Sequence, residues 1–184
     1  DFVGKSMRQI KELCNYLEQA APSLLAEDWD NVGLLAGDPE APIHRVMTCL
    51  TITPQSAAEA IERQANLIVT HHPLPFRALK RLVTTSTAGR LLWELITHGI
   101  AIYSAHTAFD STTRGINQQL AEALTLQQIV PLIPIEGAPE GTGAGRVGLL
   151  ARPRSLGEVA TQLQSFRGIV YLQNVGDLSA EGSG

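Results

Sequence analysis

The chain has 184 residues, of which 44% are hydrophobic and 17% are charged, and its formal net charge is -4. These values indicate a globular protein and exclude an intrinsically disordered one, because disordered chains combine few apolar residues with many charges. The negative charge gives no support for nucleic-acid binding, which usually needs a basic surface. The sequence shows neither an apolar run long enough to cross a bilayer nor a signal peptide, so we expect a cytoplasmic protein without a membrane segment.

Predicted strands and helices alternate along the chain. Apolar residues at helical spacing, and short apolar runs bounded by Gly, Pro or Asp, mark these elements. Thr53 followed by Pro54 is a typical helix start, and Gly99 is a typical helix stop. We predict helices at residues 7–21, 54–64, 87–98, 117–126 and 155–165, strands at residues 32–35, 45–50, 66–70, 100–104, 146–150 and 169–172, and a loop at residues 106–115.

This order of elements predicts an α/β fold, with a mixed or largely parallel sheet flanked by helices and the start of a second α/β lobe. Residues 1–6 resemble an added tag or an extension. We predict an N-terminal α/β unit at residues 7–126, a connection rich in Pro and Gly at residues 127–145, and part of a second lobe at residues 146–184. Because one strand-helix-strand unit closes a domain poorly, we expect further chain to belong to this lobe.

Two adjacent histidines, His71 and His72, follow one predicted strand, and His106 and Asp110 follow the next strand along the chain. Ligands of α/β proteins gather beyond the carboxyl ends of parallel strands, so we expect these four side chains at one edge of the sheet. Imidazole and carboxylate groups suit Zn, Mn, Fe or Ni. Adjacent histidines can serve two metal ions, or they can reach one ion from a kinked turn that Pro73 helps to fix.

The same residues also have structural interpretations. His72 can pack on neighbouring apolar side chains, and His106 can cap a loop, but four candidate ligands at two consecutive strand ends favour the metal site. Asp30 and Asn31 lie beside the first predicted strand. They either stabilise a turn by bonding to nearby backbone groups or contact the substrate or the metal ligands at the same edge.

Other sequence features indicate structure more than chemistry. Cys14 and Cys49 lie in a predicted helix and a predicted strand, and we expect both to be small buried hydrophobic residues. We expect His44 and His98 to be structural or surface residues. The glycine motif at residues 143–148 leads into a strand, whereas a dinucleotide-binding motif follows a strand and opens a helix, so we predict a turn there. The sequence has no motif for nucleophilic catalysis, and the catalytic residues stay unassigned.

Three segments, AEDWDNVGLLAGDP, LIVTHHPLPF and AIYSAHTAFDSTTRGINQQLAEAL, resemble in order and spacing the GTP cyclohydrolase 1 type 2 family, also called the NGG-interacting-factor-3-like group. The resemblance covers about residues 7–126, with a weaker continuation to about residue 177. It implies a two-lobed α/β protein that forms a toroidal homo-oligomer, usually a hexamer. It also implies a dinuclear metal site that faces the central cavity.

Matching the family's motifs to this sequence implies that His71, His72 and Asp110 are metal ligands. The resemblance places His106 close to the metal ions without making it a ligand. The family completes its site with a His and a Glu from a C-terminal segment, but no histidine follows His106 in this sequence. We therefore expect these 184 residues to carry half of the family's ligand set.

These observations together predict a metal-dependent hydrolase with two divalent metal ions in each complete subunit. The ions would activate water for attack on a nucleotide-like or other small anionic substrate. Arg77, Lys80 and Arg81 follow the histidine pair and are candidates to contact the anion. Two alternatives stay open, which are a two-metal phosphoesterase and a metal-binding scaffold or interaction ring without turnover.

Overall fold

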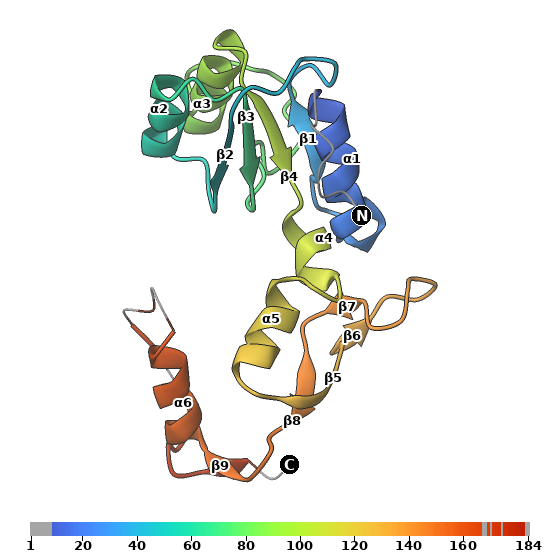
Figure 1. The fold of residues 1–184 in the computed structure, drawn as a ribbon. Helices are drawn as coiled ribbons and strands as arrows, with labels where there is room; N and C mark the ends of the chain where they lie inside the picture. The colour runs from blue at the N-terminus through green and yellow to red at the C-terminus, as the bar shows by residue number, and fades with distance from the viewer. Residues whose placement is uncertain (1–8, 167–168, 170, 174, 183–184) are drawn as a thin grey trace. The chain divides into compact units, whose positions relative to one another are not determined.

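The computed structural model of the chain describes residues 9–166, 169, 171–173 and 175–182, and it divides into two compact units (Figure 1). Unit 1 is Asp1–Thr112 and unit 2 is Thr113–Gly184. The division therefore lies before the boundary at residue 126 that the sequence predicts. The physical reason is that helix α5 (Ile116–Ala123) packs against strand β5 (Gln127–Val130), both within unit 2.

Unit 1 contains a four-stranded mixed sheet in the order β1-β4-β3-β2. Strands β2 (Val46–Cys49), β3 (Leu67–Thr70) and β4 (Ala101–Ser104) are parallel, and β1 (Gly33–Ala36) runs antiparallel to β4 at one side of the sheet. Because Gly33 pairs with Ser104, the start of β1 lies at the same edge as the carboxyl ends of the three parallel strands. This edge collects segments from four separate parts of the chain.

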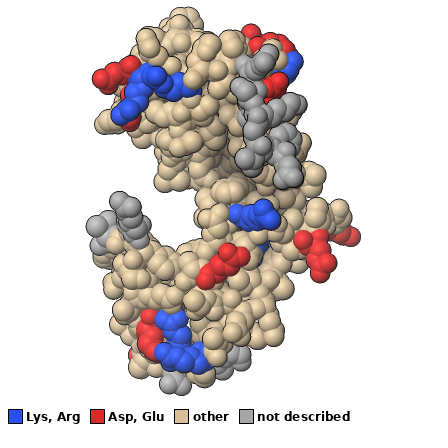
Figure 2. Space-filling view, viewed as in Figure 1, with Lys and Arg blue, Asp and Glu red and all other residues tan. Residues whose placement is uncertain are grey.

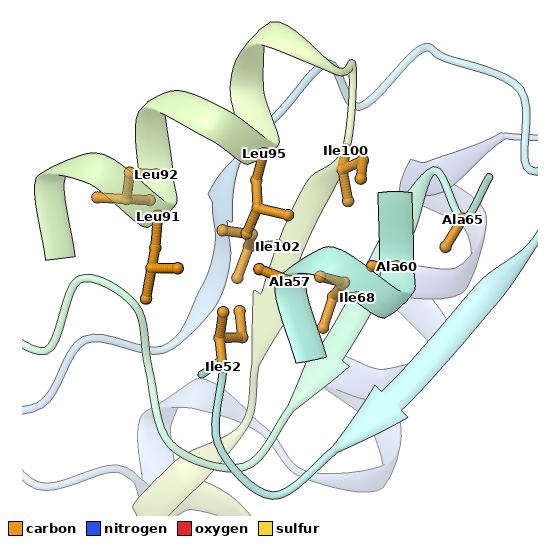
Figure 3. Packing of buried hydrophobic residues seen from close by; sticks show 10 residues of the cluster. All are labelled: Ile52, Ala57, Ala60, Ala65, Ile68, Leu91, Leu92, Leu95, Ile100 and Ile102. Carbon is orange, nitrogen blue, oxygen red and sulfur yellow. The ribbon is translucent and has the colours of Figure 1, made fainter. Parts of the chain in front are cut away.

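Helices cover both faces of this sheet, as the sequence predicts (Figure 1). Side chains of successive strand residues point to opposite faces, so Ile68 packs with helices α2 (Pro54–Glu62) and α3 (Thr87–Thr97), whereas Leu67 packs with helix α1 (Ile10–Ala20). Figure 3 shows the first of these two cores. Its buried side chains are Ile52, Ala57, Ala60, Ala65, Ile68, Leu91, Leu92, Leu95, Ile100 and Ile102.

Local capping explains where two of these helices begin. The Thr53 side chain accepts a hydrogen bond from the backbone N–H of Ser56, and the Ser56 hydroxyl accepts one from the backbone N–H of Thr53. The Ser86 hydroxyl likewise accepts the backbone N–H of Gly89 at the start of α3. These bonds satisfy donors that have no partner inside the helix, so they set its first residue. A one-turn 3-10 helix, Ser23–Leu25, follows α1.

The loop predicted at residues 106–115 is wrong in its first half, because His106–Ser111 forms a short helix, α4. Its own N-cap residue, Ala105, provides no side-chain hydrogen bond. Instead the Asp30 carboxylate accepts the backbone N–H of Thr107 at 3.1 Å. A carboxylate at a helix N-terminus is favourable, but here it comes from 77 residues away, where local sequence patterns cannot reveal it.

Unit 2 pairs its strands in three small antiparallel ladders, β5 with β8, β6 with β7, and β9 with β10. Its further elements are β6 (Ile133–Pro134), β7 (Gly143–Ala144), β8 (Val147–Leu149), β9 (Arg154–Ser155), α6 (Leu156–Gln164) and β10 (Glu181–Gly182). The connection predicted at residues 127–145 thus contains three strands. Gly143 permits one of these pairings, since it has φ +150° and an added Cβ would lie 2.3 Å from the Ile133 carbonyl oxygen.

The structure also bears on the predictions for the last strand, the two cysteines and two of the histidines. The strand predicted at residues 169–172 is not assigned at the described residues 169, 171 and 172, and residue 170 lies outside the described residues, as do residues 1–6 and Met7. Cys14 and Cys49 are only partly buried, because both lie at the margins of the two cores. His44 and His98 are exposed, which agrees with the prediction.

Neither a broad basic surface nor a membrane-spanning helix is expected from the composition, and the described residues bear on both points. On the face shown in Figure 2, Lys and Arg form small separate groups beside Asp and Glu, and no broad basic surface is visible there. In the described part of the chain, every helix is too short or too polar to cross a lipid bilayer.

Candidate metal centre

The carboxyl edge of the unit 1 sheet holds the histidine pair in place through its backbone. The backbone N–H groups of His71 and His72 donate to the carbonyl oxygens of Cys49, at 3.2 Å, and Leu50, at 2.9 Å, at the end of β2. The Ser104 hydroxyl at the end of β4 donates to the carbonyl oxygen of His71 at 2.7 Å. Both neighbouring strands thus fix the turn that carries the pair.

Three imidazole rings converge at this edge. His71, His72 and His106 each offer one ring nitrogen, and these nitrogens lie within 4.8 Å of one another. The ring centroids are 5.0 Å apart for His71 and His72, 5.2 Å for His71 and His106, and 5.7 Å for His72 and His106. The structure therefore places His106 in the same cluster as the pair, as a candidate ligand and not only as a neighbour of the metal ions.

Hydrogen bonds to one nitrogen of a ring leave its other nitrogen for a metal ion. The Thr51 hydroxyl bonds to Nδ1 of His72 at 2.6 Å. The Asp30 carboxylate bonds to Nδ1 of His106 at 2.8 Å and 3.0 Å. Such partners fix the tautomer and the ring orientation of metal-ligating histidines. Nε2 of both rings therefore remains available, so the donor set fits a divalent metal ion that prefers nitrogen ligands.

Asp30 is the buried centre of this network, because its side chain has no exposed area. Besides His106, it accepts hydrogen bonds from the hydroxyl and the backbone N–H of Thr107 and from the backbone N–H of Asn31. Burial alone would raise the pKa of the Asp30 carboxyl, but these hydrogen bonds outweigh it and lower the pKa below its ordinary value. Asp30 is therefore ionised at neutral pH, when it holds His106 and caps α4.

Asp110 lies near the cluster at the far end of α4. Its Oδ1 is 3.8 Å from Nε2 of His71. Burial lowers the pKa of His71, the charge of Asp110 opposes this shift, and the neighbouring His106 and His72 add to the lowering. His71 is accordingly neutral at pH 7, which is the state that binds metals. Among the described residues, the closely spaced cluster comprises the three histidines, and Asp110 stays a predicted ligand beside it.

The backbone of His106 has φ 25°, which is uncommon for a residue with a side chain. Such conformations persist where surrounding contacts determine them, and they are frequent at functional sites. Here the contacts are the Asp30 bonds to the ring and to the following Thr107.

Some residues of the site escape sequence analysis. Thr51 follows β2 at the same edge as the histidines, and this position in a parallel sheet was a usable signal. Thr107 follows His106 directly, but its role depends on Asp30. Trp29 and Phe76 flank His106 with ring centroids 6.2 Å and 6.0 Å away, and no local pattern marks either as part of the site.

The mixed sheet and the three histidines at its carboxyl edge identify the chain as a candidate metal-binding α/β protein. The chain belongs to the Duf34/NIF3 (NGG1p interacting factor 3) family, whose model matches residues 8–182. This agrees with the resemblance that the three sequence segments indicate.

Relatives from bacteria and animals match most of the chain. A GTP cyclohydrolase 1 type 2 homolog from Clostridium acetobutylicum is 36% identical over 169 residues, which are 92% of this chain and 63% of the relative. A NIF3-like protein 1 from Drosophila melanogaster is 37% identical over 166 residues, which are 89% of this chain and 54% of the relative. The chain thus spans somewhat more than half the length of these relatives.

Solved structures share the fold. Staphylococcus aureus hypothetical protein SA1388 superposes with a TM-score of 0.83 at 26% identity, and the match covers 96% of this chain and 70% of that one. Reduced HcgD from Methanocaldococcus jannaschii has a TM-score of 0.63 at 31% identity, covering 67% of this chain and 50% of that one.

Proposed function

We propose that this chain contributes a metal site to a metal-dependent hydrolase that acts on a nucleotide-like or other small anionic molecule. The observation that carries the proposal is the convergence of ring nitrogens from His71, His72 and His106 within 4.8 Å of one another. A bound divalent ion would supply Lewis acidity and lower the pKa of a water molecule. Relatives named GTP cyclohydrolase 1 type 2 homolog add support for a nucleotide-like substrate.

The residues around the histidines prepare the site. Thr51 and Asp30 hold two of the three rings by Nδ1, so these rings present Nε2 without further rearrangement. We propose that Asp110, whose Oδ1 is 3.8 Å from Nε2 of His71, adds a carboxylate ligand when a second ion is bound. We propose two ions in each complete subunit and a ring-shaped homo-oligomer, usually a hexamer, in the cytoplasm.

A second candidate is a metal-stabilised scaffold or interaction ring without turnover. The family description NGG1p interacting factor 3 refers to an interaction and not to a reaction, which favours this candidate. Within enzymes, a two-metal phosphoesterase would use the same groups. The three candidates share the metal site and differ in turnover.

Metal analysis of the purified protein tests the shared site. We expect zinc, manganese, iron or nickel in the wild type and loss of that metal from the His71→Ala, His72→Ala double variant. His44→Ala is the matched control, since His44 is exposed and lies outside the cluster. Equal metal content in the double variant and the control would refute the site.

Turnover then separates the candidates. The protein loaded with each metal is assayed with GTP, a cyclic nucleotide and a model phosphodiester. Metal-dependent ring opening of GTP supports the hydrolase, and cleavage of the phosphodiester alone supports the phosphoesterase. A metal-loaded protein that turns over none of them would favour the scaffold.

A further inference from the structure

A cavity of about 320 Å³ opens beside the histidine cluster. Its volume lies within the range of small-molecule sites. The lining residues are Trp29, Asp30, Asn31, Phe76, Arg77 and Ala78. They come from two short segments, one before β1 and one after the histidine pair, and the amide of Asn31 ties the segments together by donating to the carbonyl oxygen of Pro75 at 2.8 Å.

Two aromatic rings form one wall of this cavity. The centroids of Trp29 and Phe76 are 5.8 Å apart with an interplanar angle of 42°, so the rings contact each other and leave no gap for a third ring between them. Trp29 is nevertheless 58% exposed and Phe76 47% exposed. Large exposed aromatic rings that line a hollow offer a flat surface on which a planar ligand can stack.

The polar lining favours an anion with a hydrogen-bonding ring. Among the described residues, the guanidinium of Arg77 has neither an ion-pair nor a hydrogen-bond partner, so it is available to an anionic group. Asp30 also lines the cavity, but its side chain has no exposed area and its oxygens accept hydrogen bonds from His106 and Thr107, so it presents no exposed carboxylate to an anion at Arg77. The bond from Asn31 Nδ2 to Pro75 leaves Asn31 Oδ1 as an acceptor.

The wall is part of the same local structure as the metal site. Trp29 directly precedes Asp30, which holds His106, and Phe76 and Arg77 follow the histidine pair by a few residues. Both aromatic rings have centroids within 6.2 Å of the His106 ring. A ligand held on this wall therefore lies next to the histidine cluster.

We propose that this cavity binds the planar heteroaromatic ring of an anionic small molecule, with the ring against the wall formed by Trp29 and Phe76 and the anionic group on Arg77. Asn31 Oδ1 accepts a ring N–H. The inference rests on the proposed function for the reaction that follows, and it assigns the residues that select the substrate. Ring binding itself needs no turnover.

Tryptophan fluorescence reads this binding directly. The chain has two tryptophans, so Trp93→Phe leaves Trp29 as the sole reporter. We expect GMP, which has a ring and an anion, to quench Trp29 with saturation. Guanosine lacks the anion and ribose 5-phosphate lacks the ring, so we expect guanosine to bind more weakly and ribose 5-phosphate to leave the fluorescence unchanged. Nicotinate, a planar anion without a sugar, separates recognition of a ring anion in general from recognition of a nucleotide.

Variants in the Trp93→Phe background assign the two contacts. Phe76→Leu should weaken GMP and guanosine alike by about tenfold, because it removes a stacking surface. Arg77→Gln should weaken GMP by about tenfold and leave guanosine unchanged, since guanosine carries no anion. Arg90→Gln in α3 is the matched control, an exposed arginine outside the cavity lining.

Absence of saturable quenching by both GMP and nicotinate would overturn the inference, as would equal quenching by ribose 5-phosphate. A Phe76→Leu variant that changes the oligomeric state and leaves GMP binding unchanged would also overturn it, by making the wall a contact between copies. Metal content is measured in the same samples. A protein that contains metal but does not bind the ring would contradict this inference alone. A protein that binds the ring but contains no metal would contradict the proposed function alone.

Discussion

The two units of this chain differ sharply in what they bury. Among the described residues, all the buried hydrophobic side chains except Ala121 lie in unit 1. The described part of unit 2 leaves many large apolar side chains exposed. These are Ile116, Leu120, Val130, Leu132, Ile133, Val147, Leu149, Ile169, Tyr171, Val175 and Leu178.

This difference explains where a precise site can form. In unit 1, two cores fix the strands, and the strands fix the loops that carry the histidines. Unit 2 has short antiparallel ladders and, among its described residues, a single buried hydrophobic side chain, Ala121. We therefore expect ligand binding at the unit 1 sheet, where the two cores hold the strands and the loops that follow them.

Core truncation provides the largest test of this contrast. Ile68→Ala removes a fully buried side chain from unit 1 and should lower the free energy of unfolding by about 2–5 kcal/mol. Val147→Ala in unit 2 truncates a side chain that is 46% exposed, so its effect should stay below about 1 kcal/mol. Urea denaturation measures both. Similar losses for the two variants would show that unit 2 has a core of its own.

Removal of the buried Asp30 carboxylate should weaken metal binding and leave the sheet folded. Asp30→Asn weakens the hold on His106, and loss of such a partner typically lowers metal affinity by about 10-fold to 100-fold. Competition with a zinc chelator measures the affinity. Asp28→Asn, two residues away at an exposed position, should leave it unchanged. If both variants kept wild-type affinity, the role assigned to Asp30 would be wrong.

Loss of the Thr51 hydroxyl should have a smaller effect of the same kind. Thr51→Val removes one neutral hydrogen bond to His72, and neutral bonds contribute less than bonds to a carboxylate. We expect zinc affinity to fall about threefold to tenfold. Thr48→Val, within β2, is the comparison variant. A decrease equal to that of Asp30→Asn would mean that the His72 bond matters as much as the His106 bond.

The weakest expected effect is a pH dependence in unit 2. Bonding of Glu158 to the backbone of Ser155, together with Arg152, lowers the pKa of the Glu158 carboxyl. Since the folded pKa is the lower one, this contribution to the start of α6 is complete above the unfolded pKa of Glu158. It is lost as the pH falls through the folded value. The protection factors of the α6 amides, taken relative to the intrinsic exchange rate at each pH, should therefore decrease slightly on acidification, and Glu158→Gln should remove this decrease.

Much of unit 1 could be predicted from the sequence because its signals are local. Short apolar runs predict the four strands close to their observed ends. Helical spacing, the Thr53-Pro54 start and the Gly99 stop do the same for three helices. The position of the histidine pair at a strand's carboxyl end followed from the same pattern.

The rest depends on contacts between distant residues. Helix α4 begins where it does because Asp30 caps it, and no local pattern contains that information. A second long-range bond of Asp30, to Nδ1 of His106, holds this ring beside the pair. Of the strands in residues 127–145, β5 pairs with β8 further along the chain, and β6 pairs with β7 within the segment. These strands depend on pairing between separate segments, whereas the Pro and Gly content alone indicated a connection.

The most direct test of the metal site is a crystal structure of the protein grown with zinc, with anomalous data collected on both sides of the zinc edge. We predict an anomalous peak within coordination distance of His71, His72 and His106, with Asp30 still bonded to Nδ1 of His106. A zinc-loaded crystal with no peak among these three rings would contradict the account.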